Sequence, residues 1–382
     1  MWSYFVRLKS PSHMFLLFCF ITFLCLWTLF FLVRTPVFRE KVKCTDETEG
    51  CSYSFMHYGN DSLIDLRNFH YIINNRVCDS YDNVFLVILI HSAANHFELR
   101  KTIRHTWGTP EGVSKRILLV FLLAQVSDET VQSDIERESE QSRDIIQGSF
   151  KDAYRNLTYK HVMGLKWVST FCTQAEFVMK MDDDIFVEIY RLVHLLGYRK
   201  KVAFNGRPRA WPAKTLGCFV QEHMPVVRDP TSKWYVSFDE YPRNNFINYC
   251  SGWAYLMTPD VAGALEKESG KFKYFWVDDV HVTGTISKSA GIRYNWLNRY
   301  YTIETGNLVE WARSTNHYSW HYIFAPTWGD IELMEMAHKK ALNCFKKDCI
   351  CCFPTSTKHS LSKSVSNATP KLSGTAKVVR IG

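Results

Sequence analysis

The apolar run at residues 84–90 constrains the fold of this chain most strongly, because all seven of its side chains are hydrophobic. A strand in which apolar residues do not alternate with polar ones is buried on both faces, as in a parallel sheet. Residues 117–123 form a second run of this kind. The two runs therefore predict neighbouring strands in the interior of a sheet.

Helical patterns separate and follow these strands. The predicted helices are at 95–107, 129–142 and 159–171. In the first of them, Asn95 and Glu98 have the spacing of a capping pair. Shorter strands are predicted at 202–204, 234–236 and 255–257, and a helix is predicted to start at Pro259. This order predicts an open α/β sheet with a ligand at the carboxyl ends of its strands.

Residues 14–33 are almost entirely apolar and are long enough to cross a bilayer as a helix. A cleaved signal peptide is the alternative, but no small-residue cleavage site follows the run. The Lys and Arg residues on either side would place the C-terminal side in the cytosol. Ten cysteines and three glycosylation sequons beyond the run, at Asn60, Asn156 and Asn367, indicate an oxidising lumen instead. We therefore predict a single-pass type II membrane protein with a lumenal body.

The formal net charge of +8 is carried by the two ends of the chain. Residues 1–43 carry +5 and residues 346–382 carry +6, which leaves −3 for the residues between them. Nucleic-acid binding would need a basic surface on the folded body, so this class of function is discounted.

Five segments are predicted along the chain. They are a cytosolic tail, a transmembrane signal anchor, a lumenal stem, a folded domain and a basic, Ser/Thr-rich tail, at residues 1–13, 14–33, 34–80, 81–345 and 346–382. The last of these is poor in apolar residues and is expected to be disordered.

Three consecutive aspartates, Asp182, Asp183 and Asp184, follow the apolar residues 177–179 and Lys180. Carboxylates that cluster where a buried strand reaches the surface repel one another unless a cation lies among them. Oxygen ligands of this kind suit Mg²⁺ or Mn²⁺, and these ions suit a diphosphate. The triplet therefore predicts a metal-assisted site for a phosphate ester or a nucleotide sugar.

A second acidic pair, Asp278 and Asp279, lies among apolar residues. Burial raises the pKa of a carboxyl group and makes it a better base. One of the two could instead cap a helix, and both roles are compatible if one aspartate caps while the other faces a cleft.

Several ordered motifs resemble those of the β1,3-galactosyltransferases and β1,3-N-acetylglucosaminyltransferases, which are inverting enzymes of the GT-A fold. The resemblance implies an α/β fold of that type, a Rossmann-like open mixed sheet with helices on both faces. The motifs are Arg-x-x-Ile-Arg-x-Thr-Trp-Gly at 100–108, a longer motif at 138–160, Lys-x-Asp-Asp-Asp-Ile-Phe-Val at 180–187, Lys-Trp-Tyr-Val-Ser at 233–237, Tyr-Cys-Ser-Gly at 249–252 and Asp-Asp-Val at 278–280. Together they span residues 84–285 in order, with the first strand included.

The resemblance implies transfer of galactose, or of N-acetylglucosamine, from a UDP-sugar to a glycan on protein or lipid in the Golgi lumen. It implies that Asp184 binds Mn²⁺ or Mg²⁺, that Asp182 lies near the uridine or ribose, and that Asp183 supports the loop. It also implies that Asp279 is the base that takes the proton from the 3-hydroxyl of the acceptor.

Three further site residues have structural alternatives. The resemblance suggests His321 as a metal ligand, with His317 second, but a structurally bonded histidine fits this position equally well. Arg104 and Lys180 are predicted to contact the donor nucleotide, and each could instead form a structural ion pair.

The chain departs from the family pattern at Ile247-Asn248 and at Trp253-Ala254, which leaves the choice of sugar open. A non-catalytic glycan-binding relative and a metal-dependent phosphohydrolase are the alternative functions. The cysteines at 344, 349, 351 and 352 could bind zinc in the cytosol, but in a lumen we expect disulfides, including ones between chains. A homodimer is compatible with the sequence.

Overall fold

The computed structural model describes residues 62–201, 203–204, 207–208, 211–315 and 320–347. The predicted membrane anchor, its cytosolic tail and Asn60 lie outside these residues, as do His317, Asn367 and residues 348–382. Among the helices of the described part, none is both long and apolar enough to cross a membrane.

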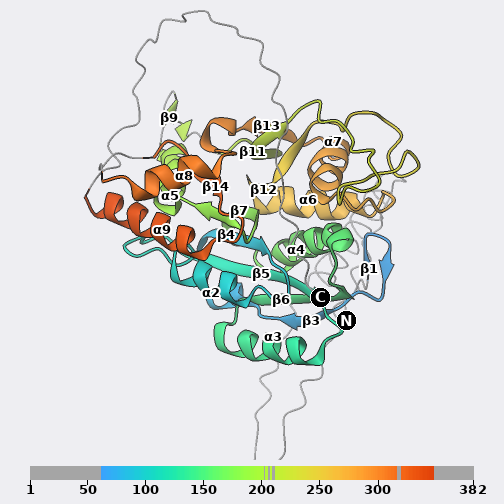
Figure 1. Cartoon of the computed structure of the whole chain (residues 1–382), viewed down its shortest axis with the longest axis horizontal. Helices are drawn as coiled ribbons and strands as arrows, with labels where there is room; N and C mark the ends of the chain where they lie inside the picture. Colours follow the sequence, from blue (N-terminus) through green and yellow to red (C-terminus); the bar gives the residue numbers. More distant parts are fainter. Residues whose placement is uncertain (1–61, 202, 205–206, 209–210, 316–319, 348–382) are drawn as a thin grey trace, which may run out of the picture. The chain divides into compact units, whose positions relative to one another are not determined.

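An eight-stranded mixed sheet forms the centre of the described body, with the strand order β13-β11-β12-β7-β4-β5-β6-β3 (Figure 1). Four central strands, β4 to β7, run parallel to one another. By contrast, β3 is antiparallel to β6, and β12 is antiparallel to both β7 and β11. The strands are β3 (Tyr71–Asn74), β4 (Val84–His91), β5 (Ile117–Gln125), β6 (Ile145–Lys151), β7 (Ala175–Asp182), β11 (Thr215–Gln221), β12 (Tyr249–Met257) and β13 (Arg293–Trp296). The predicted open mixed sheet is confirmed.

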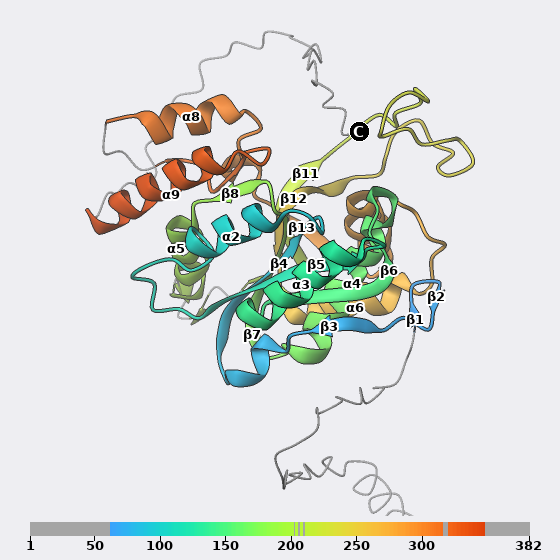
Figure 2. The same cartoon turned by 60° about the horizontal axis from the view of Figure 1, so that its bottom comes forward.

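Helices cover both faces of the sheet (Figures 1 and 2). In β4, Leu86, Ile88 and Ile90 enter a core shared with α2, α3, α5, α8 and α9, whereas Val87 and Leu89 enter a second core shared with α4 and α6. Every residue of β4 is buried, as the apolar run predicts. The helices are α2 (Phe97–His105), α3 (Glu129–Ser142), α4 (Leu157–Phe171), α5 (Ile189–Lys201), α6 (Pro259–Ser269), α7 (Ser287–Ser289), α8 (Thr305–Arg313) and α9 (Ile331–Lys346).

Shorter elements complete the described body. Three two-stranded sheets pair β1 (Ser62–Leu63) with β2 (Leu66–Arg67), β8 (Ile185–Val187) with β14 (Phe324–Pro326), and β9 (Ala203–Phe204) with β10 (Arg207–Pro208). The 3₁₀ helices are η1 (Val77–Ser80), η2 (Tyr154–Asn156) and η4 (Asn298–Tyr300), and η3 (Val280–Ile286) is a π-helix.

The order of the parallel strands places a switch point at β4. The chain moves from β4 to β5 and then to β6 on one side, and it returns to the other side of β4 with β7. The carboxyl ends of β4 and β7 are neighbours at this point, and ligands of open α/β sheets bind at the carboxyl ends of strands where the strand order reverses.

The folded body begins before the predicted boundary at residue 81. β3 lies at the edge of the main sheet and pairs with β6, and Cys78 forms a disulfide with Cys172 at the end of α4. Residues 71–80, which the sequence assigns to a stem, are therefore part of the domain. A second disulfide, between Cys218 and Cys250, joins β11 to β12.

Two local predictions are wrong. No side chain caps α2, which begins at Phe97 after His96, so Asn95 and Glu98 do not form the predicted capping pair. The ring of His96 instead contacts Asp183 in another loop. Residues 234–236 form no strand, because the backbone N–H of Val236 bonds to the Val227 carbonyl within an irregular loop.

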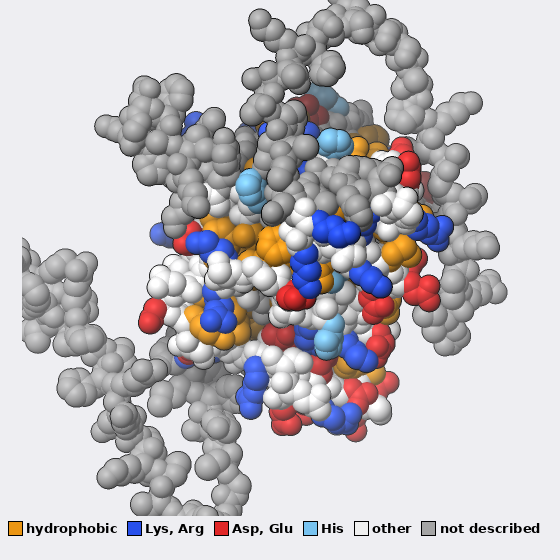
Figure 3. Space-filling model, turned by 90° about the vertical axis from the view of Figure 1, so that its left-hand side faces the viewer, with side chains coloured by type: hydrophobic (Ala, Val, Ile, Leu, Met, Phe, Trp, Pro, Cys, Tyr) orange, Lys and Arg blue, Asp and Glu red, His pale blue; other side chains and the backbone are white. Residues whose placement is uncertain are grey.

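The other predicted elements are present. The helix at 129–142 matches α3, which Asp128 caps, and α4 and α6 contain the helices predicted at 159–171 and from Pro259. On the face that Figure 3 shows, acidic and basic side chains of the described residues are interspersed.

Candidate functional site

A pocket of about 660 Å³ opens at the carboxyl ends of β4, β5, β6 and β7. These strands are parallel, so the loops that follow them meet at one edge of the sheet. The loops after β4, β5 and β6 contribute residues 91–96, 125–128 and 151–154, and the aspartate triplet closes the lining after β7. The structure thus brings the triplet to the switch point of the sheet.

The turn between β7 and β8 is held by contacts to two other loops. The backbone N–H of Asp183 donates to the His91 carbonyl at 3.1 Å, and the Asp183 carboxylate lies 2.8 Å from Nδ1 of His96. The carbonyl of Asp184 accepts hydrogen bonds from the backbone N–H of Thr327 at 2.9 Å and from its hydroxyl at 2.8 Å. These bonds fix the triplet without using the side chain of Asp184.

Two carboxyl groups of the triplet, those of Asp182 and Asp184, have raised pKa values. Burial raises the pKa of Asp182 above its ordinary value, although the nearby Lys180 ammonium opposes this. Burial and the Asp183 charge raise the pKa of Asp184. A divalent cation among these groups would favour their ionised forms and remove this repulsion.

Lys180 is buried between the triplet and the second acidic pair. Its Nζ donates to Asp182 Oδ1 at 2.8 Å and to the Gly252 carbonyl at 2.8 Å, and it lies 3.8 Å from Asp278 Oδ2. Burial alone would lower the pKa of Lys180, but the charges of Asp182 and Asp278 raise it, so the side chain is an ammonium ion. Lys180 does not line the pocket, and it acts as a shared counter-charge for the two acidic motifs.

Asp279 immediately precedes the π-helix η3. Its Oδ1 accepts a hydrogen bond from the backbone N–H of Val280 at 2.8 Å, so Asp279 itself is the capping residue. Burial and the charge of Asp278 raise the pKa of Asp279. A Cβ at Gly252 would lie 3.5 Å from Asp279 Oδ2, so this glycine leaves space beside the carboxylate.

The pKa of Asp278 is shifted in the opposite direction from that of Asp279, and His161 is one cause of this shift. Nδ1 of His161 lies 2.7 Å from Asp278 Oδ2 and must carry the hydrogen, because a carboxylate only accepts. The other ring nitrogen contacts the hydroxyl of Tyr255. Burial alone would raise the pKa of Asp278, but the Lys180 charge and the His161 hydrogen bond lower it. Neighbouring aspartates therefore have opposite pKa shifts, which is typical of acid–base sites.

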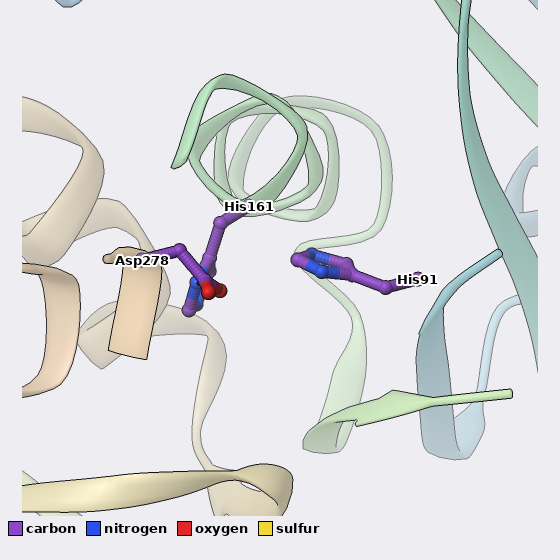
Figure 4. Close-up of side chains that lie close together, drawn as sticks. All are labelled: His91, His161 and Asp278. Atoms are coloured by element: carbon purple, nitrogen blue, oxygen red, sulfur yellow. The ribbon is translucent and has the colours of Figure 1, made fainter. Parts of the chain in front are cut away.

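Sequence reasoning missed His161 and its neighbour His91. Figure 4 shows His161 on a helix, with Asp278 on one side of it and His91 on the other. The rings of His91 and His161 lie 5.3 Å apart, edge to face, and both are buried. In the sequence, the signal for this cluster is one histidine within the apolar segment of α4. This signal is weak because most histidines in apolar segments are structural.

His91, His161 and Asp278 are close enough to hold a metal ion, since one ligand atom of each lies within 4.8 Å of the others. Two contacts oppose this use. The Lys180 ammonium is 3.8 Å from Asp278, and His161 already bonds directly to the same carboxylate oxygen. The group therefore fits a hydrogen-bonded support for Asp278 better than a metal centre.

Arg104 is held away from the pocket by ion pairs. Its Nε and Nη2 donate to the two carboxylate oxygens of Asp144 at 2.8 Å, and its Nη1 donates to Glu138 at 2.6 Å. Arg104 is not among the residues that line the pocket. The structure thus favours the structural ion pair over a contact with nucleotide.

His321 is not brought to the triplet. β14 runs antiparallel to β8, with Pro326 opposite Ile185 and Phe324 opposite Val187, so residues before Phe324 run away from Asp184. His321 is exposed and does not line the pocket. Its predicted role as a metal ligand has no support from this arrangement.

Asn156 is the one predicted glycosylation site within the described residues. It lies at the start of α4, and its Nδ2 donates to the Lys151 carbonyl at 2.8 Å. The hydroxyl of Thr158, the third residue of the sequon, is buried and donates to the Phe275 carbonyl.

The sequence of this chain matches a known protein family and several of its members. The model of the galactosyltransferase family matches residues 98–298. The β-1,3-galactosyltransferases 1 of Mus musculus and Homo sapiens are each 36% identical over 230 residues, which cover 60% of this chain and 68% of the relative. The β-1,3-galactosyltransferase 5 of Pan troglodytes is 35% identical over 227 residues, 59% of this chain and 72% of the relative.

Solved structures give only a distant likeness. The galactosyltransferase LgtC, solved with donor and acceptor sugar analogues, has a TM-score of 0.33 and 12% identity over 66% of this chain and 95% of its own.

Proposed function

This chain belongs to the galactosyltransferase family, and from that premise we propose that it is an inverting β1,3-hexosyltransferase of the GT-A fold. It transfers galactose from UDP-galactose, with N-acetylglucosamine from UDP-N-acetylglucosamine as the alternative, to a glycan on protein or lipid. The observation that carries the proposal is the shared position of Lys180 between Asp182 and Asp278. Through Lys180, the carboxylate cluster that we assign to the donor lies beside the carboxylate pair that we assign to the acceptor, and a transferase needs both.

Asp184 is the proposed ligand of Mn²⁺ or Mg²⁺. The triplet fits such an ion because it offers only oxygen ligands and because the pKa values of Asp182 and Asp184 are raised. The side chains of Asp182 and Asp183 already bond to Lys180 and His96, which leaves Asp184 as the main ligand. When bound, the ion supplies positive charge for the departing diphosphate.

Asp279 is the proposed base. The acceptor hydroxyl oxygen attacks the anomeric carbon, its proton passes to the Asp279 carboxylate, and the bond from that carbon to UDP breaks with its electron pair on the diphosphate. This single displacement inverts the anomeric configuration. Burial and Asp278 keep the pKa of Asp279 above that of an ordinary carboxyl group, which makes it a stronger base near neutral pH.

We also propose that the catalytic domain lies in the Golgi lumen behind the anchor at residues 14–33. The disulfides Cys78–Cys172 and Cys218–Cys250 support an oxidising compartment. Glycosylation at Asn60, Asn156 or Asn367 would accompany this location.

The test is a screen of UDP-sugars against a panel of methyl β-glycosides with the full-length chain, in which UDP release and glycoside products are measured. We expect UDP release that depends on the glycoside, is lost with EDTA and returns with Mn²⁺. UDP or phosphate release at the same rate without a glycoside would indicate a hydrolase. Glycan binding without UDP release from any donor would indicate a non-catalytic relative, and either result contradicts the proposal.

A further inference from the structure

Two exposed aromatic side chains from separate loops flank the Lys233 ammonium, and one of them lines the pocket. Tyr154, in η2 after β6, lines the pocket together with the aspartate triplet. Trp234 belongs to the long connection between β11 and β12, which projects from the sheet in Figure 2. The Nζ atom of Lys233 lies within cation–π range of both rings, so the two rings lie around one ammonium group.

Both rings stay open to solvent. Tyr154 is 48% exposed and Trp234 is 54% exposed, although each has bonded or packed neighbours. Lys233 places its Nζ 4.7 Å from the Trp234 ring and 6.0 Å from the Tyr154 ring. Large aromatic surface that is fixed in place but left uncovered marks a binding site more often than an isolated apolar residue does.

Tyr154 links this surface to the segment that carries the proposed base. Tyr154 lines the same pocket as Asp182. The ring of Trp276, two residues before Asp278, lies 5.9 Å from the Tyr154 ring. A ligand on this surface would therefore lie beside the segment that carries Asp279, which follows Trp276 by three residues.

Arg155 ties the two loops together. Its guanidinium lies 4.4 Å from the Trp276 ring and donates to Glu240 at 3.0 Å and to the Tyr235 carbonyl at 3.1 Å. These contacts join η2 to the loop that carries Trp234. The surface is thus pre-organised, which lowers the entropic cost of binding a ligand.

We propose that Trp234 and Tyr154 form a stacking platform for the sugar residue of the acceptor that is positioned for transfer. The C–H face of a pyranose ring packs on aromatic rings as apolar surface, while its hydroxyl groups can bond to Lys233 and to the Tyr154 hydroxyl. This inference rests on the proposed transferase function and assigns a specificity role to the Lys-Trp-Tyr-Val-Ser motif at 233–237.

The test compares Trp234→Leu, Trp234→Phe and Trp296→Leu in the full-length chain. Trp296 is the matched control because it is 52% exposed on the edge strand β13. Transfer from the UDP-sugar to methyl β-glycosides gives the KM of each substrate, and saturation-transfer NMR measures glycoside binding without turnover. We expect Trp234→Leu to raise the acceptor KM by roughly three- to tenfold and to weaken the NMR effect. Trp234→Phe should recover part of the loss, and the donor KM should stay unchanged.

Two results would overturn the platform. One is an acceptor KM and an NMR effect of Trp234→Leu that match those of Trp296→Leu. The other is an equal change in donor and acceptor KM, which would show a purely structural role for the ring. If the wild-type chain binds glycosides through Trp234 but transfers no sugar, the platform is supported and the proposed transferase function fails.

Discussion

Replacement of Lys180 by methionine tests whether the buried ammonium holds the two acidic motifs together. Methionine keeps most of the apolar stem but has neither the charge nor the N–H donors of lysine. The Lys180 side chain is 2% exposed and makes hydrogen bonds of 2.8 Å to Asp182 and to the Gly252 carbonyl. Its loss leaves Asp182 without its bonded cation and Asp278 with His161 as its main partner.

Removal of one partner from a buried ion pair costs about 3–5 kcal/mol of the free energy of unfolding. The Asp182 side chain is 36% exposed and can be partly hydrated, so the lower end, about 3 kcal/mol, is expected. With a urea m-value of about 3 kcal/mol/M, the unfolding midpoint should fall by about 1 M.

The pH dependence follows from the direction of the pKa shifts. In the wild type, the raised pKa of Lys180 gives stability that is complete below the unfolded value of about 10.4 and is lost only as pH rises through the folded value. In the variant, Asp182 and Asp278 lose a cation, so their folded pKa values rise. The folded variant then binds more protons than the unfolded one, and its stability falls as pH increases.

Urea unfolding followed by circular dichroism at pH 5 and pH 8, in EDTA, measures both effects. The destabilisation should be larger at pH 8. The control is Lys101→Met, because Lys101 is 64% exposed and its pair with Glu98 should contribute less than about 1 kcal/mol. If Lys180→Met unfolds within about 1 kcal/mol of Lys101→Met at both pH values, the shared counter-charge is refuted.

Three other predictions concern the site and the core. The kcat/KM of transfer should rise with pH as Asp279 loses its proton, with a midpoint above the ordinary carboxyl pKa of about 4. Asp278→Asn should lower this midpoint because it removes a negative neighbour, and an unchanged pH profile would argue against coupling of the two aspartates. Gly217→Ala should lower the free energy of unfolding by about 1–3 kcal/mol because the new Cβ would lie 2.4 Å from the Trp211 ring. Gly306→Ala is the control because its Cβ meets open space, and equal urea midpoints for the two variants would contradict this packing. Dialysis against EDTA should abolish transfer, Mn²⁺ should restore it, and full activity in the chelator would exclude the proposed metal.

Strong local patterns explain why much of the fold was predictable. The apolar runs that became β4 and β5 have no polar alternation, so burial on both faces was the simplest structure for them. The strand predicted at residues 234–236 is absent because aromatic and β-branched residues favour strands only where a partner strand exists. Here Arg228 instead donates to the Val236 carbonyl at 2.7 Å and holds the segment as a loop.

The candidate site was predictable where its residues are adjacent in the sequence. The triplet and the Asp278–Asp279 pair are visible as runs of carboxylates in apolar surroundings. His161 is 117 residues from Asp278, and only the fold brings the two side chains together. From the sequence, Arg104 could either contact the nucleotide or form a structural ion pair. Its bonds to Glu138 of α3 and to Asp144, the residue before β6, favour the ion pair.

The central claim, that Asp279 is the base of an acceptor-dependent glycosyl transfer, is tested most directly by the kcat of Asp279→Asn. The full-length variant is compared with the wild type and with Asp82→Asn, an exposed control, using the UDP-sugar and the methyl β-glycoside that the wild type turns over. We predict that kcat falls by about 10²–10⁴-fold in Asp279→Asn alone, with an unchanged KM for the UDP-sugar. Wild-type turnover in Asp279→Asn would contradict the account.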